Sequence, residues 1–204
     1  CQTFMRSMGQ FFEGFSVTIP HKEEMLPFAV NPSETLKKIG ALNTLSKIQN
    51  NQWEGLNTDI AAAINSIVEV MPEKSLKNQT VLVIGAGGAA RAIAIGAMQA
   101  GAKVTITNRT VIKGKKVADE LGLPFISLED TWSFEYLPFQ VIMNTTSVGM
   151  YPNIDENPLH EIKFLPKQVV FDAIYNPNKT QLIQHAEKDG AFFITGREMF
   201  VKQG

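Results

Sequence analysis

From about residue 80 onward, short apolar runs alternate with longer segments of helical composition. Apolar runs of this length are typical of strands that are buried on both faces. The segments between them end at glycines 101, 122 and 190, as helices commonly do. This alternation predicts a parallel, doubly wound α/β sheet. The expected strands are 81–84, 104–107, 141–143, 169–171 and 192–194, and the expected helices are 89–100, 111–121 and 179–188.

The first 75 residues have a different texture. Residues 15–19 form a strand-like run, 21–29 and 32–38 have helical composition, and 41–54 is polar and extended. A helix over about 58–71 and a polar connection over 72–78 follow. We place a domain boundary in that connection, so that the helix over 58–71 bridges two domains. The expected division is 1–75, 76–196 and a terminal helical segment of 197–204.

Composition narrows the class of protein. Of the 204 residues, 44% are hydrophobic and 19% are charged, which is the balance of a globular protein. The formal net charge of -1 supplies no basic field, so we expect neither nucleic acid nor a membrane as a partner. No apolar run is long enough to span a bilayer. The single cysteine, Cys1, cannot build a disulfide framework, which is consistent with a reducing compartment such as the cytoplasm.

The densest motif is the glycine run from Gly85 to Ala90, which follows an expected strand and opens an expected helix. Gly85 and Gly87 permit a tight turn and let a pyrophosphate approach backbone N–H groups at the positive end of the helix. Ala90 takes the third small position of the pattern, where helix and strand pack closely. A glycine-rich turn is also a common structural element, but its position here favours dinucleotide binding and a Rossmann-type domain.

The residues after the next strand favour one nucleotide. An NAD site usually places Asp or Glu there for the ribose hydroxyls, whereas this chain has Asn108, Arg109 and Thr110. Arg109 can clamp a 2′-phosphate with its planar donors, and Thr110 can add a hydroxyl. A solvated arginine at a strand end is the alternative, but beside the glycine run the pattern favours NADP. Arg91 is either a second phosphate ligand or a solvated helix residue.

Two ionisable residues of the first 75 are candidates for proton transfer. Hydride transfer from an alcohol needs a group that takes up the hydroxyl proton. Lys22 follows Pro20 at the expected start of a helix, and Asp59 stands where the bridging helix begins. A surface lysine and an ordinary helix N-terminal carboxylate are the alternatives, and the pattern alone does not pair the two residues. The histidines and Cys1 lack the spacing of a metal site, so no metal is expected.

Together these segments resemble the shikimate dehydrogenase family. The resemblance runs in order through nearly the whole chain. The exact residues in these segments are most similar to those of the dehydrogenase half of the bifunctional dehydroquinate dehydratase/shikimate dehydrogenases. The matching segments are 14–22 (G-x-x-V-T-x-P-x-K), 40–44 (G-A-x-N-T), 57–59 (N-T-D), 85–90 (the NADP loop), 108–110 (N-R-T), 144–150 (N-x-T-S-x-G-M), 172–180 (D-x-x-Y-x-P-x-x-T) and 196–203 (a glycine-to-glutamine segment).

The resemblance implies reversible, NADP-dependent oxidation of shikimate to 3-dehydroshikimate, in the shikimate pathway of aromatic amino-acid and chorismate biosynthesis. It implies that Lys22 is the catalytic acid/base and that Asp59 steadies its charge and position. The substrate-binding residues that it implies are Thr18, Asn43, Thr58, Tyr175 and Gln203. The cofactor-binding residues that it implies are Gly85, Ala86, Gly87, Gly88, Ala89, Asn108, Arg109, Thr110, Thr146, Ser147 and Met150.

The resemblance also assigns roles to the expected domains. Residues 1–75 would be a partial substrate-binding domain, 76–196 the NADP-binding domain, and 197–204 the start of a helix that returns to the substrate. The strand and serine-rich motif that the family places upstream are absent, as is its last helix, so we expect a piece of a longer chain. After Asp59 the family often has glycines, whereas this chain has residues 60–63 as Ile-Ala-Ala-Ala, which would tighten the approach of the bridging helix.

Two other functions stay open. A quinate dehydrogenase of the same family would differ in contacts outside this sequence. A non-catalytic NADP-binding sensor would need the glycine run and the clamp, but it gives no reason for Lys22, Asn43 and Asp59 to occur together. The partners that the resemblance implies are a small-molecule substrate and a dehydroquinate dehydratase domain fused upstream.

Overall fold

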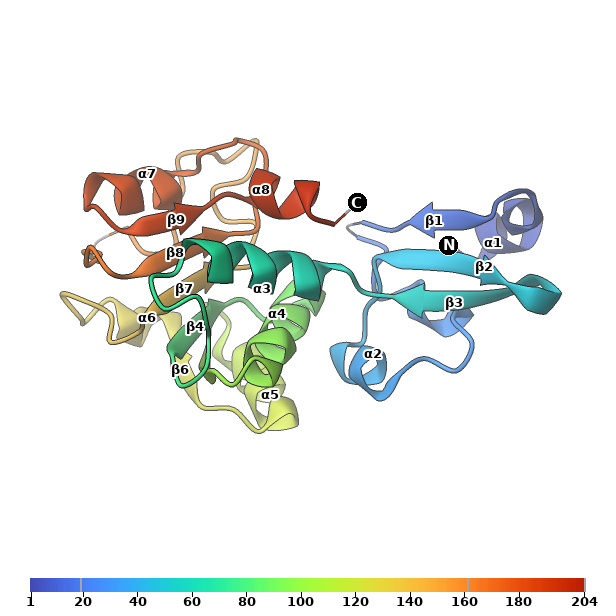
Figure 1. Cartoon of the computed structure of the whole chain (residues 1–204), viewed down its shortest axis with the longest axis horizontal. Coiled ribbons are helices and arrows are strands. Elements are labelled where there is room, and N and C mark those ends of the chain that lie inside the picture. The colour runs from blue at the N-terminus through green and yellow to red at the C-terminus, as the bar shows by residue number, and fades with distance from the viewer. Residues whose placement is uncertain (19, 161, 204) are drawn as a thin grey trace.

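The computed structural model describes residues 1–18, 20–160 and 162–203, in two lobes that lie side by side (Figure 1). The larger lobe holds a sheet of six strands in the order β6-β5-β4-β7-β8-β9, and each neighbouring pair is parallel. The predicted doubly wound sheet is therefore confirmed. Its strands are β4 (Thr80–Ile84), β5 (Lys103–Asn108), β6 (Phe125–Ser127), β7 (Val141–Asn144), β8 (Val169–Asp172) and β9 (Phe192–Ile194). Its helices are α4 (Gly88–Gln99), α5 (Val111–Leu121), α6 (Leu128–Thr131), α7 (Gln181–Lys188) and α8 (Gly196–Val201).

Strand β4 shows why a continuous apolar run was informative. Val81 and Val83 lie in the core on one face of the sheet, together with residues of α3 (Asp59–Val70) and α4. Leu82 and Ile84 lie in a second core on the other face, with residues of α7. All four side chains are at most 1% exposed. Each such burial stabilises the fold by about 1.5–3 kcal/mol, which is why both faces of the strand are apolar.

The smaller lobe is built on an antiparallel sheet in the order β1-β2-β3. The polar extended segment expected over 41–54 forms most of the hairpin of β2 and β3. Leu36, Leu42 and Leu45 are at most 3% exposed and anchor the core of this lobe. Its elements are α1 (Gln2–Met8), β1 (Gly14–Ser16), α2 (Glu34–Ile39), β2 (Thr44–Ile48), β3 (Gln52–Leu56) and the 3-10 turns η1 (Gly9–Phe11), η2 (Leu26–Phe28) and η3 (Gln49–Asn51).

The prediction of a helix over 21–29 is wrong. The N–H of Met25 donates to the carbonyl of His21 at 3.0 Å, which makes a single turn, and η2 then replaces a second turn. Pro27 explains the failure, because it lacks an N–H and disfavours helical dihedrals at the preceding residue. The carbonyl of Lys22 accepts the N–H of Leu42 at 3.0 Å, so Lys22 is held by the smaller lobe and does not start a helix.

Several bounds also differ from expectation. Strand β1 ends at Ser16, and Ile19, the last residue of the expected strand, lies outside the described residues. Elements α1, β6 and α6 were not predicted. Helix α8 begins at Gly196 and ends at Val201, so it covers only part of the terminal segment 197–204, whose last residue is not described. Among the described helices, none is long and apolar enough to cross a membrane.

The division between residues 75 and 76 stays a proposal. In its packing, α3 belongs to the larger lobe, because Ala62, Ala63 and Ile67 lie in the core that includes β4. Helix α3 nevertheless begins beside the smaller lobe, to which it is joined by the short segment after β3 (Figure 1). It therefore places its first residue, Asp59, at the boundary between the lobes.

Residues 60–63, which are Ile-Ala-Ala-Ala where the family often has glycines, belong to the part of α3 that packs against α4. A Cβ atom at Gly96 of α4 would lie 2.5 Å from Cγ2 of Ile60 and 3.1 Å from Cγ1 of Ile64. The larger side chains of α3 thus lie where α4 has none. Close approach of the two helices depends on this pairing of isoleucine with glycine.

We expect Gly96→Ala to lower the free energy of unfolding by about 1–3 kcal/mol, because the branched Ile60 cannot move aside without a rotamer change. This cost exceeds the helix propensity of alanine over glycine, which is worth about 1 kcal/mol. Urea unfolding of Gly96→Ala, Ile60→Ala and the double variant would measure it. The double variant should lose less than the sum of the single losses, and strictly additive losses would contradict the packing argument.

Candidate active site

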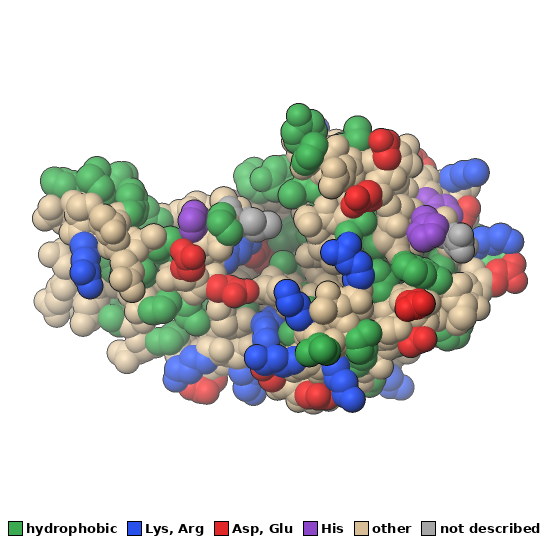
Figure 2. Space-filling view, turned by 180° about the vertical axis from the view of Figure 1, so that it is seen from behind, with side chains coloured by type: hydrophobic (Ala, Val, Ile, Leu, Met, Phe, Trp, Pro, Cys, Tyr) green, Lys and Arg blue, Asp and Glu red, His purple; other side chains and the backbone are tan. Residues whose placement is uncertain are grey.

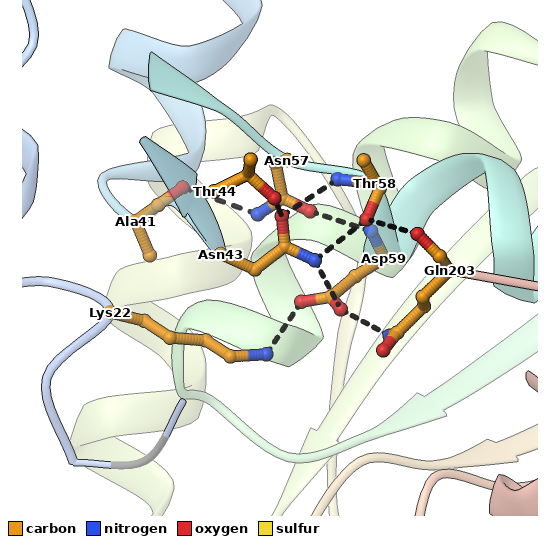
Figure 3. Close-up of polar contacts among 8 residues, drawn as sticks. All are labelled: Lys22, Ala41, Asn43, Thr44, Asn57, Thr58, Asp59 and Gln203. Carbon is orange, nitrogen blue, oxygen red and sulfur yellow. Dashed lines mark hydrogen bonds and ion pairs between the residues drawn. The ribbon is translucent and has the colours of Figure 1, made fainter. Parts of the chain in front are cut away.

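Lys22 and Asp59 form an ion pair at the boundary between the lobes (Figure 3). Lys22 Nζ lies 2.7 Å from Asp59 Oδ2, and the two side chains are 22% and 3% exposed. The carboxylate does not cap its own helix, because its oxygens accept from Lys22, Asn43 and Gln203 instead. The structure therefore brings together the two residues that sequence alone could not pair.

Asn43 orients this pair from the smaller lobe. Its Nδ2 donates to Asp59 Oδ1 at 3.0 Å and to Thr58 Oγ1 at 2.9 Å. Its Oδ1 accepts the backbone N–H of Thr58 at 2.9 Å and the hydroxyl of Thr44 at 3.1 Å. The Asn43 side chain is buried, so these bonds satisfy an amide that would otherwise be costly to bury.

Gln203 reaches the same carboxylate from the far end of the chain. Its Nε2 donates to Asp59 Oδ1, and its backbone carbonyl accepts the hydroxyl of Thr58 at 3.4 Å. Asp59 thus receives donors from Lys22, Asn43 and Gln203, which belong to three separate segments (Figure 3). These contacts join the end of the chain to the turn after β1.

Asn57 and Thr44 complete the network, although neither was among the predicted site residues. Asn57 Nδ2 donates to the carbonyl of Ala41 at 3.2 Å, and its Oδ1 accepts the N–H of Asp59 at 3.1 Å. Asn57 therefore supports the start of α3, and Thr44 fixes the amide of Asn43. Both stand within the motifs quoted above, so the motifs themselves were the available signal.

Among the described residues, no hydrogen bond or ion pair joins Thr18 or Tyr175 to this network. Thr18 is exposed, and its carbonyl accepts the N–H of His21 at 2.9 Å. Tyr175 follows β8 and is 59% exposed, with its ring centroid 5.6 Å from that of Phe200. Roles for these two residues in substrate binding stay proposals.

The glycine turn after β4 has the form that a dinucleotide requires. Gly87 is the N-cap of α4, and no side chain caps this N-terminus, so the first N–H groups of the helix are available for a pyrophosphate. A Cβ at Gly87 would meet no atom within 4 Å, which leaves open space at the turn. Gly85 has φ of +131°, a backbone conformation that glycine adopts without strain. The remaining predicted residues of the turn are Ala86, Gly88 and Ala89.

The expected clamp lies at the end of β5. Arg109 and Thr110 are exposed, and Asn108 Nδ2 donates to the carbonyl of Thr110 at 2.9 Å, which shapes this turn. No carboxylate of the described residues pairs with Arg109, so its guanidinium is available for a phosphate. Arg91 instead forms an ion pair with Glu120 at 2.5 Å, so it is not simply solvated.

Two further loops leave the same edge of the sheet, after β7 and β8. Thr146 donates its N–H and its hydroxyl to Asn144 Oδ1 at 3.1 and 2.7 Å, whereas Ser147 and Met150 are exposed. The neighbouring Asp172 is fully buried, and burial raises the pKa of its carboxyl to about 6. β4 and β7 are adjacent in the sheet, but the chain continues from β4 toward one edge of the sheet and from β7 toward the other. Sheets of this kind bind their ligands at the point where the strand order reverses in this way.

One group of possible metal ligands was missed by the spacing argument. Cys1 Sγ lies 3.4 Å from His21 Nδ1 and 3.1 Å from Glu24 Oε2, although the sequence places these residues far from Cys1. All three residues are exposed, and nothing in their geometry requires an ion. The absence of a metal from the reaction stays a prediction.

The space-filling surface is hollowed between the two lobes (Figure 2). In the sheet, the glycine turn and the loops after β7 and β8 all lie at the carboxyl ends of the strands. Asp59 begins α3 at the boundary between the lobes, and Ala41 lies so close to the glycine turn that a Cβ at Gly88 would be 2.9 Å from its Cβ. The arrangement can hold a nucleotide on the larger lobe beside the Lys22–Asp59 pair.

Comparison with known proteins agrees with this geometry. Residues 1–45 match the family described as shikimate dehydrogenase substrate binding domain, and 67–147 match the family described as shikimate / quinate 5-dehydrogenase. Among solved structures, shikimate dehydrogenase from Aquifex aeolicus has a TM-score of 0.84 and 34% identity, over 99% of this chain and 73% of that one. Shikimate 5-dehydrogenase from Thermus thermophilus, solved with NADP(H) and shikimate, has a TM-score of 0.81 and 30% identity, over 98% and 71%.

Two curated relatives are longer than this chain. The bifunctional 3-dehydroquinate dehydratase/shikimate dehydrogenase of Arabidopsis thaliana is 40% identical over 204 residues, and the alignment covers 94% of this chain but 34% of that protein. The shikimate dehydrogenase (NADP(+)) of Shouchella clausii is 38% identical over 198 residues, which cover 96% of this chain and 71% of the relative. The chain therefore belongs to the shikimate dehydrogenase family.

Proposed function

We propose that the protein containing this chain catalyses the reversible, NADP-dependent oxidation of shikimate to 3-dehydroshikimate. The observation that carries the proposal is the Lys22–Asp59 pair at 2.7 Å, held by Asn43 and Gln203 at the boundary between the lobes. A sensor needs no such pair. Relatives named shikimate dehydrogenase (NADP(+)) support the choice of reaction and cofactor.

Lys22 moves the proton in the proposed reaction. During oxidation the neutral amine takes the proton of the reacting hydroxyl, and during reduction the ammonium returns it to the carbonyl oxygen. Asp59 holds Nζ in one place and offsets its charge when it is protonated. Bound NADP(H) supplies the hydride chemistry, and Thr146, Ser147 and Met150 would line the site that holds its nicotinamide.

Substrate binding and cofactor binding fall to different parts of the structure. Asn43, Thr58 and Gln203 keep the carboxylate oriented and present polar groups to the ring hydroxyls and carboxylate of the substrate. Residues 85–89 bind the pyrophosphate through backbone N–H groups at the start of α4. Because the reacting hydroxyl must meet Lys22 while its carbon faces the nicotinamide, the boundary between the lobes is where the reaction would take place.

A spectrophotometric assay tests the proposed function. The full-length protein should reduce NADP when shikimate is added and much more slowly when quinate replaces it. Equal rates with the two substrates would assign quinate dehydrogenase activity instead. Tight NADP binding without turnover of either substrate would favour the sensor and would overturn the proposal.

We expect Arg109→Ala to weaken NADP binding by about 10- to 100-fold, the effect of losing one charge-assisted contact worth roughly 1.5–3 kcal/mol. NAD binding should change little, because NAD lacks the 2′-phosphate. Fluorescence titration with both nucleotides measures the two affinities. Arg6→Ala is the matched control, because it removes an arginine from the smaller lobe, away from the clamp, and should leave both affinities unchanged. An unchanged preference between NADP and NAD in Arg109→Ala would refute the clamp.

The wider context of the chain is also proposed. The bifunctional relative from Arabidopsis thaliana supports fusion to an upstream dehydroquinate dehydratase domain. A location in the cytoplasm, or in the plastid of a plant, would follow from the pathway. The mass of the native protein and immunolocalisation would test these two points.

A further inference from the structure

Asp172 is a buried carboxylate to which the proposed reaction gives no role. It ends β8 and is 0% exposed. Its Oδ1 accepts Nδ2 of Asn144 at 3.1 Å and the N–H of Ile174 at 3.0 Å. Its Oδ2 accepts the hydroxyl of Thr180 at 2.6 Å. One side chain therefore connects the end of β7, the end of β8 and the start of α7.

Each of these donors controls a loop at the carboxyl edge of the sheet. Asn144 begins the segment 144–150, and its Oδ1 holds both the N–H and the hydroxyl of Thr146. Thr180 ends the segment 173–180, which carries Tyr175, and its hydroxyl also caps α7 by accepting the N–H of Ile183 at 3.4 Å. Asn144 and Thr180 are themselves at most 1% exposed, so neither has water as a ready substitute partner.

We propose that Asp172 is a positioning residue, whose carboxylate fixes the segments 144–150 and 173–180 relative to each other and so sets the shape of the nicotinamide site. This inference rests on the proposed function. Asp172 is itself 0% exposed, so it is not placed to touch substrate or cofactor. Its effect passes through Asn144 and Thr180, which lie beside the switch point where a sheet of this kind binds its ligand.

The electrostatic setting of Asp172 supports this role. Burial raises the pKa of the Asp172 carboxyl to about 6, and hydrogen bonds from Thr180, Ile174 and Asn144 oppose the rise. These partners are neutral, and no charged residue of the described β7, α7 or α8 contributes to the shift. Near neutral pH the fold therefore keeps an ionised group in an apolar place, where an amide or an apolar residue would be less costly.

Thr180→Val is the decisive variant, because it removes the hydroxyl but keeps the shape of the side chain. We expect it to weaken NADP binding by up to about tenfold and to lower kcat as well, because the nucleotide must then order two segments that this hydrogen bond no longer holds in place. Thr180→Ser keeps the hydroxyl and should restore both values to within about threefold of the original protein. Fluorescence titration with NADP and steady-state kinetics with shikimate measure the two effects.

Thr131→Val is the matched control. Thr131 is equally buried and donates to the carbonyl of Leu128 at 2.5 Å, but it lies in α6, away from both segments. It should lower the melting temperature without changing NADP affinity or kcat. If Thr180→Val does no more than Thr131→Val, Asp172 has a merely structural role and the inference fails. If the original protein has no shikimate activity, NADP titration of the variants still tests the role of Asp172. Failure of the proposed function can therefore be told apart from failure of this inference.

Asp172→Asn supplies a readout that depends on pH. A carboxyl with a raised pKa contributes stability that is fully present below its ordinary pKa of 3.8 and is lost as the pH rises through about 6. An amide does not titrate, so the melting temperature of Asp172→Asn should rise relative to that of the original protein between pH 5 and 7.5. A difference that is constant over this range would mean that the Asp172 carboxyl does not titrate there, which would contradict its raised pKa.

Discussion

Replacing Lys22 by alanine in the full-length protein is expected to lower kcat for shikimate oxidation by about two to four orders of magnitude, the contribution of a positioned acid/base. NADP affinity should stay within about twofold, because the glycine turn and the clamp lie on the other lobe. Steady-state kinetics and a fluorescence titration of NADP would measure the two quantities. A variant that kept a tenth or more of the original kcat would remove Lys22 from the chemistry.

Stability must be separated from catalysis in this experiment. Asp59 is 3% exposed, and removing one partner of a buried ion pair costs about 3–5 kcal/mol, because an uncompensated charge remains. The double variant Lys22→Ala/Asp59→Asn removes both charges and should regain much of the lost stability, but it should stay inactive. Lys47→Ala is the matched control, because Lys47 pairs with Glu13 at 3.7 Å on the same lobe and touches no proposed site residue. Its kcat should be that of the original protein.

The larger lobe was predictable because local patterns determined it. A strand such as β4 is buried on both faces, and therefore a continuous apolar run marks it without any knowledge of its neighbours. Gly101, Gly122 and Gly190 have φ of +85°, +68° and +79°, so each glycine marked a place where a helix or its last turn ends in left-handed backbone. The strand β6 was missed because only two of its residues, Phe125 and Ile126, are apolar, and because it lies half-buried at the edge of the sheet.

The smaller lobe was less predictable because tertiary contacts decide its local structure. Residues 21–29 have helical composition, yet Pro27 and the hydrogen bond between Leu42 and Lys22 impose turns instead. The fit of Ile60 against Gly96 is likewise invisible in sequence, because the two positions meet only when α3 packs on α4. Such pairings depend on the distance between elements rather than on the pattern within one element.

The candidate site falls between these cases. Sequence placed Lys22 and Asp59 each at the start of an expected helix, but it offered no physical reason to pair residues 37 positions apart. In the folded chain, Leu42 holds the backbone of Lys22 and the adjacent Asn43 holds Asp59, so the two residues meet beside the start of α3. Only the resemblance to a family had brought these residues together. Asp172 was quoted within a motif but received no role, since its burial and its three donors are properties of the folded chain.

Replacing Gly87 by valine is expected to weaken NADP binding by about two to four orders of magnitude and to change the free energy of unfolding by no more than about 1 kcal/mol. Gly87 has φ of -97° and ψ of -172°, an extended conformation that valine adopts easily. A side chain there would meet no protein atom, but it would fill the space through which a pyrophosphate reaches the first N–H groups of α4. Two hydrogen bonds to a charged phosphate, each worth roughly 1.5–3 kcal/mol, would then be lost.

Gly85→Ala is the comparison variant for Gly87→Val, because Gly85 is needed for the backbone conformation of the turn and not for access of the pyrophosphate. Its φ of +131° disfavours any side chain, and a Cβ there would collide with Oγ1 of Thr145. Gly85→Ala should therefore lower the melting temperature, whereas Gly87→Val should leave it nearly unchanged and lose the nucleotide. Calorimetric titration with NADP and thermal melting of both variants separate the two effects. Retention of full NADP affinity by Gly87→Val would mean that the turn after β4 is a structural glycine turn, and the nucleotide would have to bind elsewhere.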